Sequence, residues 1–224
     1  MKPITMLLAG SALLALILSW PAASGEAMAT LPDPVLDAPL VKTPGRQTAV
    51  FAGGCFWGVQ AVFQHLNGVI SATSGYAGGG AASARYDQVS GGRSGHAEAV
   101  SVVYDPARTS YGQLLKVFFA VAHDPTQLNS QGPDSGSQYR SAIFAANAEQ
   151  QRLARAYVKQ LEQGKVFAAP IVTQINAPDS YTFYAAEDYH QDYLKKHPEQ
   201  SYIVINDLPK LAQLKRQFPT QYRD

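Results

Sequence analysis

The sequence predicts an α+β fold built as a two-layer sandwich, with additional helices and long loops around the sheet. Segments of strand character and segments of helical periodicity are mixed along the chain without strict alternation. A strict alternation would favour a doubly wound parallel sheet, whereas the mixed order favours two layers. The 224 residues, of which 46% are hydrophobic, suit one globular domain with a substantial core.

The N-terminal residues have the composition of an export signal followed by a linker. Lys2 precedes an almost continuous apolar run over residues 4–20, and small residues follow it. We therefore expect residues 1–24 to be a signal peptide or a membrane anchor. An anchor is an alternative because a run of about 17 apolar residues is at the lower limit for a membrane span. The small residues favour cleavage, and export to a bacterial periplasm. The proline-rich residues 25–47 are expected to form a linker, or an arm wrapped on the domain.

The folded domain is expected over residues 48–224, beginning with a strand, a turn and a helix. Residues 48–52 form a short apolar strand, and residues 59–66 place apolar side chains at helical spacing. Other apolar runs are bounded by turn-forming residues, which is typical of strands. These further strands cover residues 69–75, 98–104, 139–144, 171–175 and 181–184.

Four more helices are predicted from periodicity, propensity and their end signals. Ser110 is a suitable N-cap for the first, Gly164 closes the second, and a His-Pro pair ends the third. The first of these helices follows Ser110, and the other three cover residues 148–163, 187–196 and 208–218. The glycine-rich residues 75–95 and the polar residues 126–137 are expected to be loops, which allow the backbone to approach a ligand.

Cys55 is the only cysteine in the chain and lies where the first strand turns into the first helix. It excludes an internal disulfide and a cysteine-based metal site. A lone cysteine is usually a small buried hydrophobe, but the glycines on both sides weaken strand and helix. They make sense if a ligand must approach the sulfur. The start of a helix favours an anion, so we expect a thiol pKa below its free value of about 8.5.

Few polar residues are placed to work with Cys55. Glu98 opens an apolar strand and shares a face with its apolar residues, so it is either a buried acid or a half-exposed residue at a strand start. A buried carboxyl group has a raised pKa and can carry a proton at neutral pH. Tyr86, Asp134 and Tyr139 lie in or beside the loops and are weaker candidates, since each also suits a surface or core-edge position.

The histidines and the overall charge limit other functions. Glu187 and His190 would share one helix face as a surface pair, because a metal site needs three or four ligands. His65 lies about 15 Å along the helix from Cys55, which leaves His96 and His123 as candidate bases for acyl transfer. The formal net charge of +1 argues against nucleic-acid and acidic-membrane partners.

Eight sequence blocks together resemble the peptide methionine sulfoxide reductase A family. They occur in the family's order and spacing between about residues 48 and 198. The blocks are residues 54–58 (GCFWG), 75–76 (GY), 95–100 (GHAEAV), 104–106 (YDP), 123–127 (HDPTQ), 131–134 (QGPD), 138–142 (QYRSA) and 184–191 (YAAEDYHQ).

The resemblance implies a ferredoxin-like α/β sandwich that reduces the S epimer of methionine sulfoxide, free or in proteins. Cys55 would attack the sulfoxide sulfur and become a sulfenic acid. Glu98 would give a proton to the sulfoxide oxygen. Tyr86 and Tyr139 would donate hydrogen bonds to that oxygen, and Asp134 would help to place the substrate.

The same resemblance assigns the substrate's methyl group to an apolar side of the site. Phe56 and Trp57 would hold the S-methyl group, with Gly54 beside them. Aromatic rings on one side and buried donors on the other would discriminate the two ends of the sulfoxide. No metal or cofactor is expected, and the protein is expected to be a monomer.

The chain departs from a common family pattern because it has no second cysteine. Many members carry resolving cysteines near the C-terminus, but residues 201–224 contain none, and Ser90 stands where some members have one. We therefore expect an external thiol, either a thioredoxin-like protein or a small molecule, to reduce the sulfenic acid. A thiol peroxidase, a non-catalytic binder of oxidised methionine and a cysteine hydrolase are the alternatives.

Overall fold

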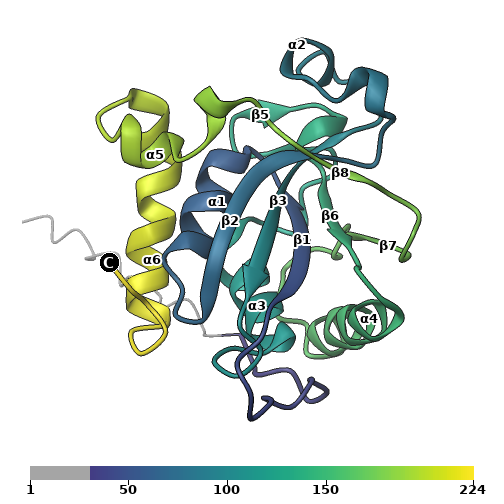
Figure 1. The fold of residues 1–224 in the computed structure, drawn as a ribbon, viewed down its shortest axis with the longest axis vertical. Coiled ribbons are helices and arrows are strands. Elements are labelled where there is room, and N and C mark those ends of the chain that lie inside the picture. The colour runs from purple at the N-terminus through teal and green to yellow at the C-terminus, as the bar shows by residue number, and fades with distance from the viewer. Residues whose placement is uncertain (1–30) are drawn as a thin grey trace, which may run out of the picture.

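The computed structural model describes residues 31–224, which surround one central sheet (Figure 1). The expected signal segment 1–24 and the first residues of segment 25–47 lie outside the described residues. The sheet has the strand order β7-β6-β1-β3-β2-β8, and only the β6–β7 pair is parallel. Its strands are β1 (Gln47–Gly53), β2 (Val69–Ala77), β3 (Ala97–Tyr104), β6 (Ser141–Phe144), β7 (Gln174–Asn176) and β8 (Phe183–Ala185).

Helices and short turns connect these strands, as the sequence predicts for a mixed α and β fold. Figure 1 shows α1 and α6 next to each other beside the sheet, and they are in contact. The helices are α1 (Phe56–Gln64), α2 (Tyr86–Val89), α3 (Tyr111–Val117), α4 (Ala148–Gln163), α5 (Tyr193–Lys196) and α6 (Leu208–Gln217). A hairpin of β4 (Ser130–Gln131) and β5 (Asp134–Ser135) lies within the expected loop 126–137.

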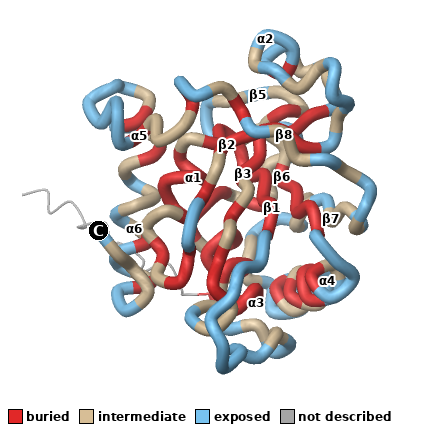
Figure 2. The backbone as a smooth tube through the Cα atoms, in the orientation of Figure 1, coloured by how far each residue is buried: buried red, intermediate tan, exposed pale blue. Residues whose placement is uncertain are grey.

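The sheet is buried on both faces in its central strands (Figure 2). On the helical face, Phe51 stacks against Phe63 and Phe118, with ring centroids 5.0 Å and 4.9 Å away. The opposite face carries mainly alanines and is covered in part by Tyr181 and Phe183. Because both faces of β3 are covered, six of its eight residues are buried.

One end of the sheet brings together segments that are distant in the sequence. Gly53, the last residue of β1, pairs with Ser141, the first residue of β6. Ala77, at the end of β2, pairs with Ala97, at the start of β3. The turns that follow β1 and β2 and those that precede β3 and β6 therefore meet at this end.

Residues 31–46 lie against the opposite end of the sheet, near the starts of β1 and α3. The hydroxyl group of Tyr157 donates to the carbonyl of Pro32 at 2.8 Å. The Asp37 carboxylate accepts hydrogen bonds from the Gly112 backbone N–H at 2.7 Å and from the Ser110 hydroxyl group. Within residues 31–224, no helix is both long and apolar enough to cross a membrane.

Four predicted elements differ from the structure. The strand predicted from residue 139 begins at Ser141, because Ser137–Tyr139 form a 3-10 turn. The strand predicted over residues 171–175 begins only at Gln174. The polar helix predicted over residues 187–196 is absent as such. The strand predicted over residues 181–184 begins only at Phe183.

The third difference has a tertiary cause. Asp188–His190 form a 3-10 turn, Gln191 is extended, and α5 begins only after Asp192, whose φ is 56°. The Gln191 side chain bonds both backbone groups of Ser74, at 3.0 Å each. These bonds to β2 hold Gln191 in an extended conformation and interrupt the helix that the local propensity favours.

The contact of Asp37 with α3 makes a testable contribution to stability. Asp37→Ala leaves the Gly112 N–H of the first helical turn without its acceptor, so we expect a loss of about 1 kcal/mol in the free energy of unfolding. Urea denaturation of the full chain measures it. Asp33→Ala, which removes the ion pair between the exposed Asp33 carboxylate and Lys116, should cost less than about 0.5 kcal/mol. Equal losses in the two variants would contradict the capping role.

Candidate active site

A cavity of about 190 Å³ opens at the end of the sheet where the four turns meet. Seven of its eight lining residues are among those that the sequence predicts for the site. Gly54, also predicted, precedes Cys55 in the chain and does not line the cavity. The lining residues are Cys55, Phe56, Trp57, Tyr86, Glu98, Asp134, Tyr139 and Tyr202.

Cys55 is held at the N-cap of α1, between β1 and the helix. Its side chain is 8% exposed. The backbone N–H of Phe56, in the first turn of α1, donates to Glu98 Oε2 at 3.0 Å. Gly54 has a φ of +87°, and a Cβ there would lie 2.4 Å from Gln131 Cγ. Only glycine therefore fits the turn that places the thiol beside Glu98.

Glu98 is a buried acid, which decides between the two alternatives that the sequence leaves open. Its side chain is 2% exposed, because β3 lies between β1 and β2. Burial is the main cause that raises the pKa of Glu98 to about 8. The nearby Asp134 raises this pKa further, whereas the hydrogen bond from the Phe56 N–H opposes the shift. The carboxyl group therefore carries a proton at neutral pH and can donate it.

The Cys55 thiol does not have the lowered pKa that its place at a helix start predicts. Burial raises its pKa well above the ordinary value, and the nearby Glu98 and Asp207 carboxyl groups raise it further. The Trp57 backbone N–H and the Lys210 ammonium group oppose this shift. The expectation was wrong because it weighed the helix start without the tertiary burial. The site therefore holds a thiol beside a carboxylic acid.

Tyrosine hydroxyl groups form the polar side of the cavity together with Glu98. Burial raises the pKa of Tyr86, Tyr139 and Tyr202, so each hydroxyl group keeps its proton as a donor. The Tyr202 hydroxyl group donates to Asp134 Oδ2. The hydroxyl groups of Tyr86 and Tyr139 and the Glu98 carboxyl group can therefore donate hydrogen bonds to an oxygen atom in the cavity.

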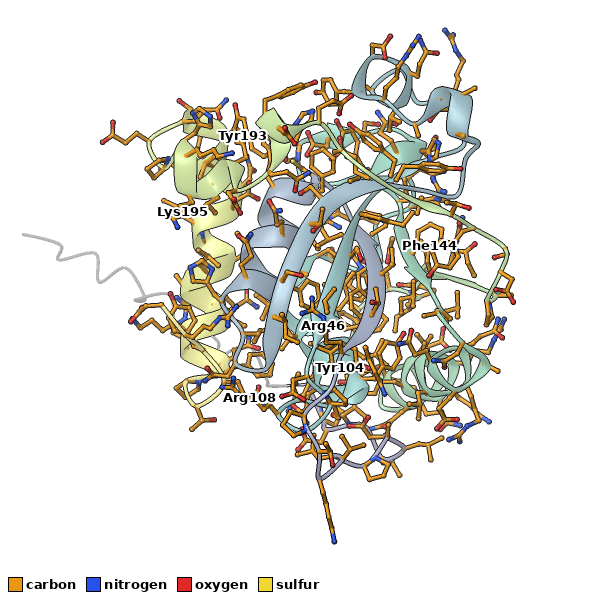
Figure 3. The ribbon with its side chains drawn as sticks, viewed as in Figure 1. Arg46, Tyr104, Arg108, Phe144, Tyr193 and Lys195 are labelled. Carbon is orange, nitrogen blue, oxygen red and sulfur yellow. The ribbon has the colours of Figure 1, made fainter. Side chains whose placement is uncertain are left out.

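The Trp57 indole forms the apolar side with Phe56 and is held by several contacts. It stacks on Tyr193 of α5, with centroids 3.7 Å apart and planes at 5°; Figure 3 labels Tyr193. The Tyr202 ring meets it edge-on at 5.9 Å. Trp57 Nε1 donates to His190 Nδ1 at 3.2 Å. The cavity thus has a fixed aromatic wall facing its polar donors.

Tyr202 and Asp207 are the residues near the site that the sequence reasoning missed. Tyr202 precedes the π-helical turn Ile203–Asp207 and lies outside every matched block. Asp207 is fully buried and pairs with Lys210 at 3.2 Å. A Cβ on Gly58 would lie 2.1 Å from Asp207 Oδ1. The glycine at position 58 of the first helix is therefore the one sequence feature that could have indicated a closely packed side chain.

Glu187 and His190 do not form the surface pair that the predicted helix over residues 187–196 would give. His190 is buried against Trp57. Glu187 accepts from the Tyr76 hydroxyl group at 2.8 Å and from the Tyr86 backbone N–H at 2.9 Å. The prediction was wrong because the segment is a 3-10 turn packed under the cavity. Both side chains support residues of the site.

No histidine lines the cavity formed by these described residues. His65 caps the far end of α1, and His96 bonds Gly80 O through Nε2 at 3.0 Å. His123 Nε2 bonds the Ser141 hydroxyl group at 2.7 Å. The arrangement therefore lacks the imidazole base that a cysteine hydrolase uses. Over residues 31–224, no group of three or more potential ligands could hold a metal ion.

Comparisons with known proteins give one consistent family. A family model described as peptide methionine sulfoxide reductase matches residues 47–222. Peptide methionine sulfoxide reductase MsrA 2 of Mesorhizobium japonicum is 58% identical over 181 residues, which cover 81% of this chain and 92% of the relative. The MsrA 2 of Synechocystis sp. is 53% identical over 196 residues, covering 87% and 89%.

Two solved structures are also similar to this chain. Mxr1 from Saccharomyces cerevisiae in reduced form has a TM-score of 0.60 and 32% identity, covering 71% of this chain and 93% of that one. Methionine sulfoxide reductase A of Corynebacterium diphtheriae has a TM-score of 0.60 and 35% identity, covering 70% and 77%.

The raised pKa of Glu98 makes stability depend on pH. The unfolded chain releases this proton near the ordinary pKa of 4.5, whereas the folded protein keeps it to about 8. The folded state thus binds more protons between these values, and stability falls as pH rises through the window. We expect urea denaturation to show wild type losing stability relative to Glu98→Gln between pH 5 and 8. Parallel pH curves for the two proteins would contradict the buried acid.

Proposed function

The chain belongs to the peptide methionine sulfoxide reductase family, and we propose that it reduces the S epimer of methionine sulfoxide, free or in oxidised proteins, to methionine. The family expected from the sequence is confirmed, and the protein is an oxidoreductase. One observation carries the proposed chemistry. Cys55 and a protonated Glu98 face the same small cavity, whose walls are aromatic on one side and donate hydrogen bonds on the other.

The cavity suits the two unlike ends of a methyl sulfoxide. The S–O group is strongly polar and needs donors, which Tyr86, Tyr139 and Glu98 supply. The methyl group needs apolar contact, which Phe56 and Trp57 supply. Asp134, which accepts from Tyr202, places the substrate. A substrate turned end for end would lose the hydrogen bonds and bury an unpaired oxygen, which costs about 1–3 kcal/mol.

In the first step, oxygen moves from the substrate to Cys55. The sulfur of Cys55 attacks the sulfoxide sulfur and forms an S–S bond while Glu98 gives its proton to the oxygen. This S–S bond and the bond between the substrate sulfur and oxygen then break as the hydroxyl group moves to the Cys55 sulfur, which releases the thioether. The thiol is oxidised to a sulfenic acid by two electrons, and the sulfoxide is reduced to a thioether by the same two. The proton released by the Cys55 thiol restores the Glu98 carboxyl group. Atoms and charges therefore balance.

The second half of the cycle needs two thiols from outside the chain, since Cys55 is the only cysteine. One thiol displaces water from the sulfenic acid and forms a mixed disulfide. A second thiol then attacks this disulfide and releases Cys55 as a thiol. A thioredoxin-like protein or a small thiol fits this role.

Location, assembly and topology complete the proposal. Residues 1–24 act as a signal peptide or membrane anchor that exports the enzyme to a bacterial periplasm. Residues 25–47 form a linker or arm before the catalytic domain of residues 48–224. The enzyme is a monomer. The apolar run that begins at Ile4 supports this. The order β6-β1-β3-β2, with α1 and α3 in the two crossovers, supports a ferredoxin-like sheet.

The alternative functions have less support. A thiol peroxidase would need an arginine or a similar donor near the thiol, and no arginine lines the described cavity. The guanidinium group of Arg140 bonds backbone carbonyls instead, including His96 O at 3.1 Å. A non-catalytic binder of oxidised methionine would have no use for a protonated acid beside a thiol.

Two substitutions test the roles of the thiol and the acid. We expect Cys55→Ser to abolish methionine formation in an epimer-resolved assay on methionine sulfoxide. Glu98→Gln should lower the rate of the reductive step by about a hundredfold at pH 7, because general acids contribute roughly that much. The R epimer serves as the control and should not react. Full activity of Cys55→Ser, or faster turnover of hydrogen peroxide than of the sulfoxide, would contradict the proposal.

The oxidation state of Cys55 after one turnover tests the catalytic cycle. Without a reductant, each enzyme molecule should form one methionine and stop, because no second thiol in the chain resolves the product. Mass spectrometry with a sulfenic-acid trap should find the label on Cys55. Added thioredoxin or dithiothreitol should restore turnover. Stoichiometric product together with an unmodified thiol would refute the mechanism.

A further inference from the structure

Asp207 lies at the start of α6, but its side chain does not cap that helix. An aspartate in this position usually accepts a hydrogen bond from a backbone N–H group of the first turn. Here the side chain packs against α1 instead, because a Cβ on Gly58, the third residue of α1, would lie 2.1 Å from Asp207 Oδ1. Asp207 is fully buried. Its carboxyl group is therefore held against the helix start that carries Cys55.

Lys210 is the charged partner of Asp207. Its Nζ lies 3.2 Å from Asp207 Oδ1, and its side chain is 18% exposed. The same Nζ would lie 2.8 Å from a Cβ on Gly58, so both charged groups occupy the space that the glycine leaves open. Burial raises the pKa of Asp207 and Asp134 adds to this, whereas the Lys210 ammonium group opposes the shift. The ion pair therefore favours the charged form of the Asp207 carboxyl group.

Stability does not account for this buried ion pair. Removing two charges from water costs about as much free energy as their attraction returns, so apolar side chains would stabilise the fold as well. Among the described residues, Asp207 Oδ2 has no hydrogen-bond partner, which adds to the cost of burying the carboxylate. An arrangement that is costly and lies beside the only thiol of the chain points to a role in the chemistry of that thiol.

The Asp207 carboxylate opposes the effect of the helix start on Cys55. Cys55 is the N-cap of α1, where the helix dipole and the free N–H groups favour a thiolate. A carboxylate against the same turn repels a thiolate. After burial and Glu98, Asp207 is the next cause that raises the pKa of the Cys55 thiol, and Lys210 opposes it by a smaller amount. The ion pair thus acts on the thiol as a net negative charge.

Two kinds of reaction at Cys55 differ in the charge that they place beside Asp207. In the proposed reduction of a sulfoxide, Glu98 gives its proton to the substrate and the proton of Cys55 restores Glu98, so the net charge of the site does not change. A disulfide or an alkylating electrophile takes no proton from Glu98 and needs a free thiolate. This thiolate bonds to the sulfur or carbon of the reagent, and a thiolate or a halide leaves. The Asp207 carboxylate therefore opposes the second kind of reaction more than the first.

We propose that Asp207 is a specificity-determining residue that acts through Cys55: its carboxylate, held against the first turn of α1 together with Lys210, keeps the resting sulfur as a thiol, so that Cys55 reacts with a bound sulfoxide in preference to disulfides and electrophiles. The preference for the sulfoxide rests on the proposed function. A chain with one thiol has a particular need for this selectivity. If a disulfide captured Cys55, no second cysteine in the chain could release it.

The pH dependence of alkylation by iodoacetamide tests the effect of the charge on the full chain. Alkylation needs the thiolate, so its rate between about pH 6 and 10 reports the ionised fraction of Cys55. Glu98 titrates as well, and a Glu98→Gln background removes this second group. The other titratable groups that line the cavity, Asp134 and three tyrosines, are the same in every variant. In this background, Asp207→Asn keeps the shape and removes the charge, so the midpoint should fall by about one pH unit.

Asp105→Asn is the matched control. It removes the same charge from another buried aspartate, which follows β3 at the end of the strand away from Glu98, and it should leave the midpoint unchanged. If Asp207→Asn does not fold, Asp207→Ser removes the charge with a smaller side chain and should also lower the midpoint. An unchanged midpoint in the folded variant at position 207, or an equal fall in Asp105→Asn, overturns the inference.

The selectivity itself is measured at pH 7 with Glu98 in place. Asp207→Asn should raise the rates of alkylation and of mixed-disulfide formation with the uncharged disulfide of 2-mercaptoethanol about threefold, because lower nucleophilicity offsets part of an about tenfold gain in thiolate. Single-turnover reduction of the S-sulfoxide should change less, since that reaction keeps the charge of the site constant. Equal gains in all three rates overturn the selectivity. A wild-type chain that forms no methionine refutes the proposed function, whereas the alkylation midpoints still decide the effect of Asp207 on the thiol.

Discussion

The hydrogen bond between the Phe56 backbone N–H and Glu98 joins the first turn of α1 to the first residues of β3. It places a buried carboxyl group beside the only thiol of the chain. The bond exists because β1 and β3 are antiparallel neighbours, so the end of one lies beside the start of the other. The same pairing buries Glu98 between two strands and keeps its proton in place. The position of Glu98 beside Cys55 and the protonation of Glu98 thus both result from the strand order of the sheet.

The rest of the site divides into a reacting layer and a supporting layer. Cys55 and Glu98 face the cavity with the tyrosine hydroxyl groups. Behind them, Glu187 and His190 hold the aromatic and tyrosine residues from a turn that belongs to neither neighbouring helix. The reacting groups come from the turns at one end of the sheet, whereas this support comes from a segment more than eighty residues further along the chain than Glu98. Precision at the cavity therefore depends on the packing of the C-terminal third.

Local patterns predicted the reacting layer better than the supporting one. Alternation placed Glu98 on an apolar face, but only the long-range pairing of β3 determines that this face is buried. The helix start at Cys55 was correctly predicted, whereas its pKa was not, because burial and the Asp207 carboxyl group are tertiary effects. The 187–196 segment has helical propensity, yet the bonds of Gln191 to β2 override it. Tyr202 lies outside the matched blocks, and no pattern in the sequence connects it to Asp134.

The arm of residues 31–46 and the cavity lie at opposite ends of the molecule. The arm lies where β1 starts, whereas the cavity opens where β1 ends, at the other side of the fold (Figure 1). The arm thus joins the domain on the side away from the cavity. A bulky client, such as a whole protein with an oxidised methionine on its surface, can approach the cavity without steric conflict with the arm. The same side leaves room for the external thiol of the proposed cycle, whether it belongs to a protein or to a small molecule.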